Sequence, residues 1–219
     1  IWSSIVALSK LAANSFDLTD NYAFTGTTTG ATSTQKLFLI KNLDASSSST
    51  LSFVDGASSV VLDNTYKTYY FKFINLHPSA STNLQFNGST DTGSNYNVTK
   101  TSTFFQTRHD EDDSPTQLAY ETGKDLAQGT GFQQLVPYVG TGNDESVVGE
   151  LFLFNPSSTT FVKHFMAQTN GYGTDGSNNS LYGGFAAGYF NTTSAIDAIQ
   201  FKMASGNIDS GRIALYGIK

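Results

Sequence analysis

The stretch Ala195 to Lys219, AIDAIQFKMASGNIDSGRIALYGIK, decides the fold class because it contains two alternating segments that a polar turn separates. Apolar side chains recur there at every second position, which is typical of β-strands with one buried face. The predicted core positions are Ile199, Phe201, Met203, Ile213 and Leu215. We therefore predict a C-terminal β-hairpin, with strands over 198–203 and 212–218, that closes an all-β domain.

The composition of the whole chain supports the same fold class. Charged residues make up only 14% of the 219 residues and aromatic residues 13%, whereas Ser, Thr, Asn and Gly are abundant. This balance favours strands and polar turns over surface helices. Alternating segments recur at the spacing of a β-sandwich or barrel. The further predicted strands cover residues 36–41, 50–54, 59–62, 68–75, 83–87, 134–139, 147–155, 160–169 and 184–191.

Two regions lack this alternation. Residues 110–131 are acidic and rich in glycine, and we expect one short helical turn there, over 120–127. Residues 170–183 are rich in glycine and asparagine, and they predict a loop.

The first residues carry a helical pattern instead. Ile1, Ile5, Leu8 and Ala12 are spaced four, three and four residues apart, like heptad positions on one helix face. The stripe is either the tail of a longer, oligomerising coiled coil or an extended segment rich in β-branched residues. Both alternatives make residues 1–30 an attachment segment or stem, followed by a head domain over 31–219. Ile1, Ile5 and Leu8 are then expected oligomer contacts.

Charge and residue content exclude several classes of function. The formal net charge of −6 argues against nucleic-acid binding, which needs clusters of Lys and Arg. No run of about 18 apolar residues occurs, so we expect no membrane insertion. The chain has no cysteine, and it therefore has no disulfide or thiolate zinc site. We expect no cofactor.

The letters Gly171-Tyr172-Gly173-Thr174-Asp175-Gly176 match the G-x-G-x-x-G pattern of dinucleotide-binding proteins. No helix pattern follows, and no βαβ unit is visible. We therefore interpret the segment as part of a loop.

The densest charge cluster lies in residues 109–113. Asp110, Asp112, Ser114 and Glu121 occupy the first, third, fifth and twelfth positions of a calcium-loop pattern. Pro115 stands where that loop needs glycine, and flanking helices are missing. A solvated acidic loop is the preferred interpretation, and an adventitiously bound ion is the alternative.

Catalytic motifs are absent from the sequence. No Gly-x-Ser-x-Gly elbow occurs, and the three histidines show no zinc-ligand spacing. A glycosidase needs two facing carboxylates, for which Glu150 and Asp197 are the candidates, but their relative position cannot be derived from sequence. We expect a protein that is not an enzyme.

One set of residues suggests sugar binding. Sugar rings stack on tyrosine rings, whereas Asn, Asp and Ser side chains hydrogen-bond to hydroxyl groups. The alternative is that the tyrosines only anchor a glycine-rich loop to the sandwich. The candidate ligand-binding residues are Tyr172, Asp175, Asn178, Asn179 and Tyr182.

Four segments carry a family resemblance: Phe16 to Gly26 (FDLTDNYAFTG), Phe71 to Pro78 (FKFINLHP), Phe161 to Phe165 (FVKHF) and Ser205 to Lys219. Together they resemble virion structural proteins of marine tailed bacteriophages, including those that infect cyanobacteria and related oceanic hosts. The segment LTDNYAFTG and the ending LYGIK are the more specific parts. No catalytic residues come with the resemblance.

The resemblance implies a jelly-roll-like β-sandwich head, often trimeric, at the end of a tail fibre or on a capsid. The expected function is that of a non-enzymatic homotrimeric fibre head on the exterior of the virion, assembled in the host cytoplasm. It would bind other virion proteins through its N-terminal segment and host surface polysaccharide through its head. The alternatives are a capsid decoration or cement protein and, third, a polysaccharide-degrading tailspike. In a trimer, Arg212 and Tyr216 are expected subunit contacts.

Overall fold

The computed structural model describes residues 36–114, 116–175 and 178–219. In these ranges every regular element is a β-strand, which confirms the predicted all-β class. The helical turn predicted over 120–127 is wrong, because a strand ends at Tyr120 and residues 122–124 form a turn. The predicted attachment segment, with Ile1, Ile5 and Leu8, lies outside the described residues.

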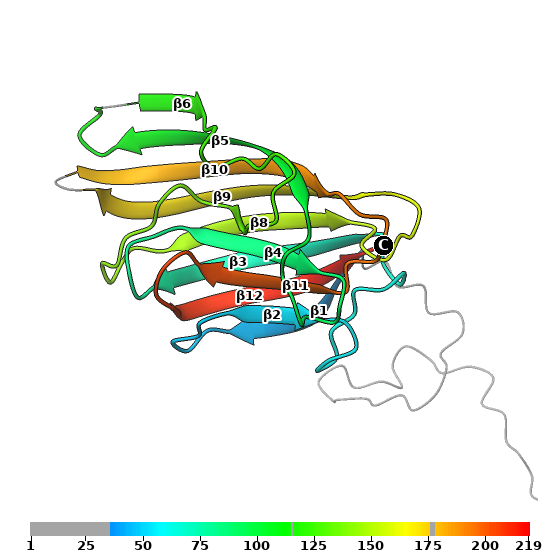
Figure 1. Ribbon diagram of the computed structural model, residues 1–219. Helices are drawn as coiled ribbons and strands as arrows, with labels where there is room; N and C mark the ends of the chain where they lie inside the picture. The colour runs from blue at the N-terminus through cyan, green and yellow to red at the C-terminus, as the bar shows by residue number, and fades with distance from the viewer. Residues whose placement is uncertain (1–35, 115, 176–177) are drawn as a thin grey trace, which may run out of the picture. The chain divides into compact units, whose positions relative to one another are not determined.

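Eight strands form the larger of two antiparallel sheets (Figure 1). Its edge strands are β1 and β6, and neighbours are hydrogen-bonded throughout. In spatial order the sheet contains β1 (Leu37–Asp44), β12 (Ile208–Ile218), β3 (Thr68–Pro78), β8 (Val147–Phe154), β9 (Lys163–Asp175), β10 (Asn178–Phe190), β5 (Lys100–Asp110) and β6 (Thr116–Tyr120).

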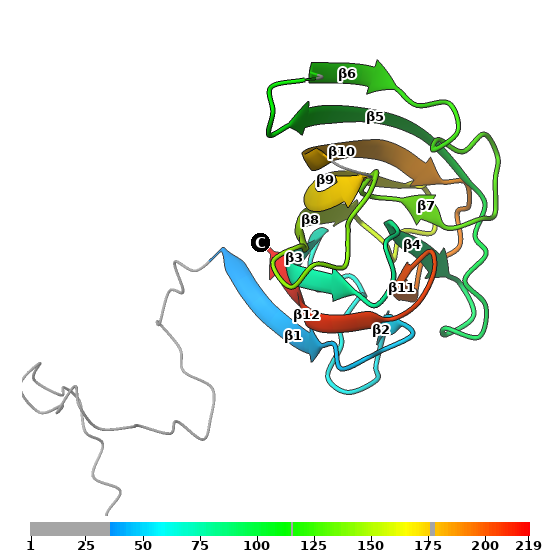
Figure 2. The same cartoon turned by 90° about the vertical axis from the view of Figure 1, so that its left-hand side faces the viewer.

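The smaller sheet covers one face of the larger one. It contains, in spatial order, β2 (Leu51–Val54), β11 (Ala198–Met203), β4 (Leu84–Ser89) and β7 (Gln133–Gln134). Figure 2 shows the large sheet as an arc from β6 to β1, with β7, β4, β11 and β2 on one side of it. We call this side the inner face and the opposite side the outer face.

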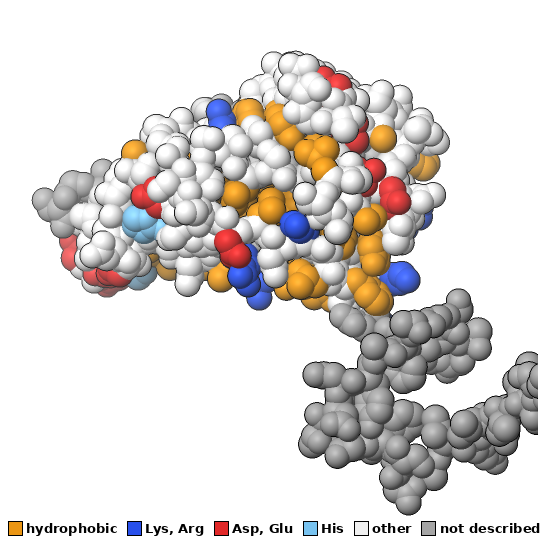
Figure 3. Space-filling view, turned by 90° about the horizontal axis from the view of Figure 1, so that it is seen from below, with side chains coloured by type: hydrophobic (Ala, Val, Ile, Leu, Met, Phe, Trp, Pro, Cys, Tyr) orange, Lys and Arg blue, Asp and Glu red, His pale blue; other side chains and the backbone are white. Residues whose placement is uncertain are grey.

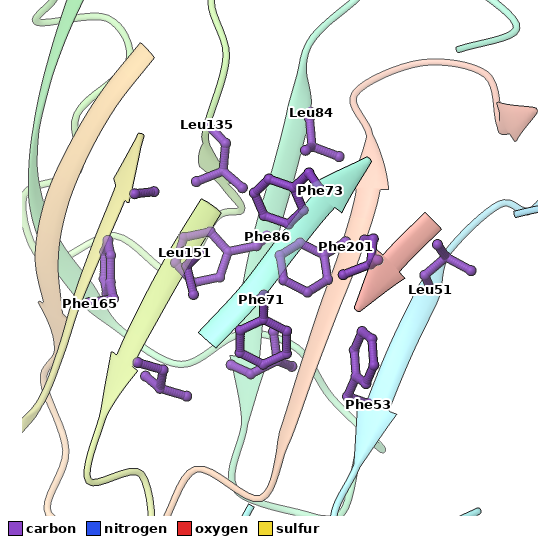
Figure 4. Packing of buried hydrophobic residues seen from close by; sticks show 14 of the residues in the cluster. Leu51, Phe53, Phe71, Phe73, Leu84, Phe86, Leu135, Leu151, Phe165 and Phe201 are labelled. Carbon is purple, nitrogen blue, oxygen red and sulfur yellow. The ribbon is translucent and has the colours of Figure 1, made fainter. Parts of the chain in front are cut away.

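An aromatic cluster fills the space between the sheets (Figure 4). Phe201 of β11 lies 5.3 Å from Phe71 and 5.3 Å from Phe73 of β3, measured between ring centroids. It also lies 6.2 Å from Phe86 of β4 and 6.3 Å from Phe53 of β2. All five rings are buried, so their packing joins the two layers into one β-sandwich.

The predicted C-terminal hairpin is wrong. β11 pairs with β2 and β4 in the small sheet, whereas β12 pairs with β1 and β3 in the large sheet. The connection over 204–207 therefore crosses from one layer to the other, and Gly206 supplies a positive φ of 71° there. The predicted core positions are nevertheless right, since all five are buried. Alternation requires only that one face of each strand is buried. Two sheets that pack face to face bury that face whether or not the two strands pair with each other.

Other predicted boundaries need correction. Residues 59–62 are no strand, although Val60 and Leu62 are buried. The region 110–131 contains β6, and its neighbour β5 was not predicted. Along the chain, strands alternate between the two sheets except at the pair β5–β6 and in the run β8–β9–β10, which lie side by side in the large sheet. The jelly-roll connectivity in particular stays a prediction.

The surface is largely uncharged. Figure 3, which views the molecule from the side of β1 and β2, shows scattered Lys, Arg, Asp and Glu among uncharged polar surface and separate apolar groups. No helix in the described ranges is long and apolar enough to cross a membrane.

Candidate functional site

The far ends of β9 and β10 form the first candidate site, which we call the tip. The loop predicted over 170–183 is wrong, because β9 and β10 stay paired up to Asp175 and Asn178. Asn178 pairs with Asp175, Ser180 with Gly173 and Tyr182 with Gly171. The G-x-G-x-x-G letters thus lie largely in a strand, and their interpretation as part of a loop is wrong up to Asp175.

Close packing explains why glycine occurs here. A Cβ at Gly171 would lie 2.6 Å from the carbonyl oxygen of Tyr138, and one at Gly173 would lie 2.5 Å from the amide nitrogen of Gly140. Both distances are shorter than real side chains tolerate. Glycine therefore lets residues 138–140 cross the inner face directly against β9.

The tip brings together some of the predicted ligand-binding residues. Asn178 and Asn179 line a hollow of about 310 Å³ together with Glu111 and Asp112, which follow β5. The Asn179 side-chain amide donates a hydrogen bond to Glu111 Oε2 at 3.0 Å. Tyr172 lies on the outer face like Asn179, close enough to the Glu111 carboxylate to feel its charge. Asp175 ends β9, next to them.

Tyr182 does not belong to this hollow. Its side chain points to the inner face and only 5% of its surface is exposed. Its ring packs edge-to-face on Tyr138 at 5.4 Å, and the Arg108 guanidinium lies 5.3 Å from the ring centre. For this residue the structure matches the alternative in which a tyrosine anchors the segment to the sandwich.

A hydrogen-bonded ion pair stabilises the strands beneath the tip. Asp110 accepts hydrogen bonds from Arg108 Nε at 2.7 Å, from Arg108 Nη2 at 3.0 Å and from the Ser180 hydroxyl at 2.6 Å. These bonds lower the pKa of Asp110 to about 2, so it remains a carboxylate. Burial and the Glu111 carboxylate raise the pKa of Tyr172, so its hydroxyl keeps its proton.

The residues that match a calcium-loop pattern do not form one loop. Asp110 is committed to Arg108 and Ser180, whereas Glu121 lies beyond β6, with its amide bonded to the carbonyl of Phe104 at 2.9 Å. Within the described ranges, no group of three or more His, Asp or Glu side chains is placed to hold a metal ion. What the tip offers is carboxylate oxygens, amides and a phenol, which are suited to hydroxyl-rich ligands.

The outer face of the large sheet carries a second candidate site, which sequence reasoning missed. We call it the aromatic band; its members are Tyr216, Tyr70, Phe152, Met166, Phe185 and Phe105. The rings of Tyr70 and Phe152 lie 4.9 Å apart, and those of Tyr70 and Tyr216 5.8 Å. Phe105 and Phe185 stack at 4.9 Å with their planes 9° apart. A hollow of about 210 Å³ separates Phe152 from this stacked pair.

A signal for the band was present in the sequence. The run Tyr69-Tyr70-Phe71 and the run Leu151 to Phe154 are apolar at consecutive positions, which places large side chains on both faces of their strands. Such runs indicate that both faces of a strand have partners. The alternating runs of β11 and β12 carried more weight in the prediction.

The two residues expected at a subunit contact lie in different surroundings. Tyr216 belongs to the aromatic band. Arg212 forms two hydrogen bonds to Asp44 of the neighbouring β1, at 2.6 and 3.0 Å. This pairing lowers the pKa of Asp44. A role of either residue between subunits stays a prediction.

The candidate carboxylates for sugar hydrolysis lie on different sheets. Glu150 is on the outer side of β8, where Tyr70 Oη donates a hydrogen bond to it at 3.1 Å. Asp197 directly precedes β11 of the small sheet, and its Oδ2 accepts a bond from the amide of Thr92 at 3.0 Å. Their strands offer no facing pair.

The chain matches no known protein family, no curated protein and no solved structure. The features from which a function can be inferred are therefore the tip and the aromatic band.

Proposed function

We propose that this chain is a non-enzymatic structural protein of a tailed-bacteriophage virion. In this proposal it is a homotrimeric fibre head on the outside of the particle, assembled in the host cytoplasm, and its tip binds host surface polysaccharide. The sequence resemblance supports the assignment to a virion. A cysteine-free chain suits folding in a reducing cytoplasm, and a surface with few charges loses little when salt screens ion pairs.

The position of the tip carries the proposal. The chain enters the large sheet at Lys36, beside Lys219, whose amide donates a hydrogen bond to the carbonyl of Lys36 at 3.0 Å. β9 begins at the same end of the sheet and has 13 residues, which corresponds to about 40 Å at ~3.3 Å per residue. Figure 1 shows the end of β9 and the start of β10 at the side opposite the C-terminus. A head held at residue 36 would present the tip outward.

The chemistry of the tip is suited to a sugar. The Glu111 and Asp112 carboxylates and the Asn178 and Asn179 amides line one hollow, and they can bind several hydroxyl groups at once. Tyr172 beside them provides a ring on which a sugar can stack. Of the predicted ligand-binding residues, we retain Tyr172, Asp175, Asn178 and Asn179, and leave out the buried Tyr182.

One observation favours the alternative of a capsid decoration protein. The aromatic band is a large apolar surface, and such surfaces mark contacts with proteins more often than with sugars in solution. A decoration protein needs contacts of this kind and no receptor site.

The test is binding of the purified full chain to an array of polysaccharides from a permissive host. We expect the wild type to bind and Tyr172→Ala to weaken binding by about tenfold, because a stacking ring is lost. Tyr189→Ala is the matched control, since Tyr189 lies on the same strand pair at the other end. Absence of binding by the wild type would overturn the adhesin role, and equal losses in the two variants would overturn the tip as the site.

A further inference from the structure

We propose that a second copy of this chain covers the aromatic band. The inference rests on the proposed assembly of copies and adds the surface through which the heads meet. It assigns no role to the tip, which lies at the far end of the same strands.

The band is an apolar surface that crosses neighbouring strands in register. Tyr216 of β12 pairs with Tyr70 of β3, Tyr70 with Phe152 of β8, and Phe152 with Met166 of β9. Phe185 of β10 pairs with Phe105 of β5 in the adjacent row. Side chains at paired positions of neighbouring strands lie on one face, so the band is continuous.

Several members of the band are open to solvent in the single chain. Met166 is 56% exposed and Phe105 41%, and the flanking Leu39 is 52% exposed. The inner face of the same sheet is already filled by the small sheet, and no other described segment covers the outer one. An apolar surface of this kind favours association.

The charges of the band favour a copy of the same chain as its partner. Lys72 of β3 and Glu150 of β8 are paired neighbours of opposite sign and line the hollow beside Tyr70. Two identical faces can therefore place a positive charge opposite a negative one. The acidic cluster of residues 110–113 lies at the tip, so meeting bands would not bring these acids together.

The point at which the chain enters the sheet gives a further argument. Leu39 of β1 pairs with Tyr216, so residue 36 adjoins one end of the band. The 35 preceding residues include the heptad spacing of Ile1, Ile5 and Leu8, for which the sequence predicts association between copies. Copies joined there would hold their bands at high effective concentration.

The experiment uses the absence of cysteine from the chain. Met166→Cys places one thiol in the band, and the matched control Phe161→Cys places one outside it, at a residue that is 68% exposed. Each purified full-length variant is treated with a maleimide reagent, and the molecular mass of the purified wild-type protein in solution is measured by light scattering. We expect a multimeric mass. We also expect the thiol of Met166→Cys to react at least about tenfold more slowly than that of Phe161→Cys, because a covered thiol reacts only when the interface opens.

Each outcome is decisive. A multimeric mass with a slow thiol in Met166→Cys and a fast one in Phe161→Cys supports the proposal. A monomeric mass overturns it, and so does equal reactivity of the two thiols in the native protein, which would mean that the copies join elsewhere or that another partner covers the band in the virion. Both thiols must react equally fast in denaturant. A monomeric mass would also contradict the proposed homotrimer, whereas equal thiol reactivity in a multimer would overturn the band alone, and loss of polysaccharide binding would overturn only the role of the tip.

Discussion

The rings of Phe201 and Phe71 meet across the two sheets with their centroids 5.3 Å apart. They belong to β11 and β3, and each is fully buried. This contact joins β11 of the small sheet to β3 of the large sheet, and it exists because the two sheets pack face to face.

We expect Phe201→Ala to lower the free energy of unfolding by about 3–5 kcal/mol, because it removes a ring that four other rings contact. Denaturant unfolding of the full chain measures this. Phe161→Ala, at a largely exposed ring, should change stability by less than about 0.5 kcal/mol. Equal effects of the two changes would contradict the described core.

Gly171→Ala tests the packing beneath the tip. The new Cβ would lie 2.6 Å from the backbone of Tyr138, so the segment 138–140 must shift. We expect a loss of about 1–3 kcal/mol in the free energy of unfolding. Gly131→Ala is the control, because nothing lies within 4 Å of the position that its new methyl group would take. A neutral Gly171→Ala would mean that the segment does not cross β9 this closely.

We expect the free energy of unfolding to depend on pH because of Lys100. It is fully buried, and its ammonium group donates hydrogen bonds to Asn87 Oδ1 at 2.6 Å and to the Val98 carbonyl at 2.9 Å. Burial lowers the pKa of Lys100 from 10.5 to about 7. Between these two values the unfolded chain holds a proton that the folded chain has released, so stability increases as the pH rises through this window.

The measurement compares the wild type with Lys100→Met, in which this titration is absent. We expect the difference in free energy of unfolding to shift in favour of the wild type by up to about 1.4 kcal/mol per pH unit above about pH 7. Parallel stability curves of the two proteins between about pH 7 and pH 9 would show that Lys100 keeps its ordinary pKa.

We expect Glu145 to stabilise the tip through its hydrogen bonds. Only 5% of it is exposed, and its Oε1 accepts hydrogen bonds from the Thr174 amide at 2.6 Å and the Thr174 hydroxyl at 2.9 Å. Burial raises the pKa of Glu145, but the bonds from Gly142 and Thr174 lower it more, so it ends below 4.5. The stabilisation is therefore present above pH 4.5 and is lost as the pH falls through the lowered pKa.

We expect Glu145→Gln to speed hydrogen exchange of the Thr174 amide at neutral pH, and the difference from the wild type to vanish in acid. Asp144→Asn, at an exposed neighbouring carboxylate, is the control and should leave this amide unchanged. Unchanged exchange of the Thr174 amide in Glu145→Gln would show that Glu145 does not stabilise the tip.

Local patterns in the sequence predicted which side chains are buried better than they predicted which strands pair. Ile199, Phe201 and Met203 alternate, and all three are buried. The pairing of β11 with β2 and β4 depends on segments more than 100 residues away, which no local pattern contains. A short polar turn fits both a hairpin and a crossing between sheets.

The tip was predicted in part, for a similar reason. Gly171 and Gly173 indicate a loop when they are considered alone. In the structure their missing side chains make room for residues 138–140, a contact between distant segments. The aromatic band was missed because its rings come from strands that the fold alone places side by side.

The proposed fibre-head role is best tested by electron microscopy of phage particles proposed to carry this chain, labelled with antibody raised against residues 36–219. We expect label at the ends of the tail fibres. Label over the capsid would contradict the fibre-head role and favour the decoration protein, and particles without any label would contradict the assignment to the virion surface.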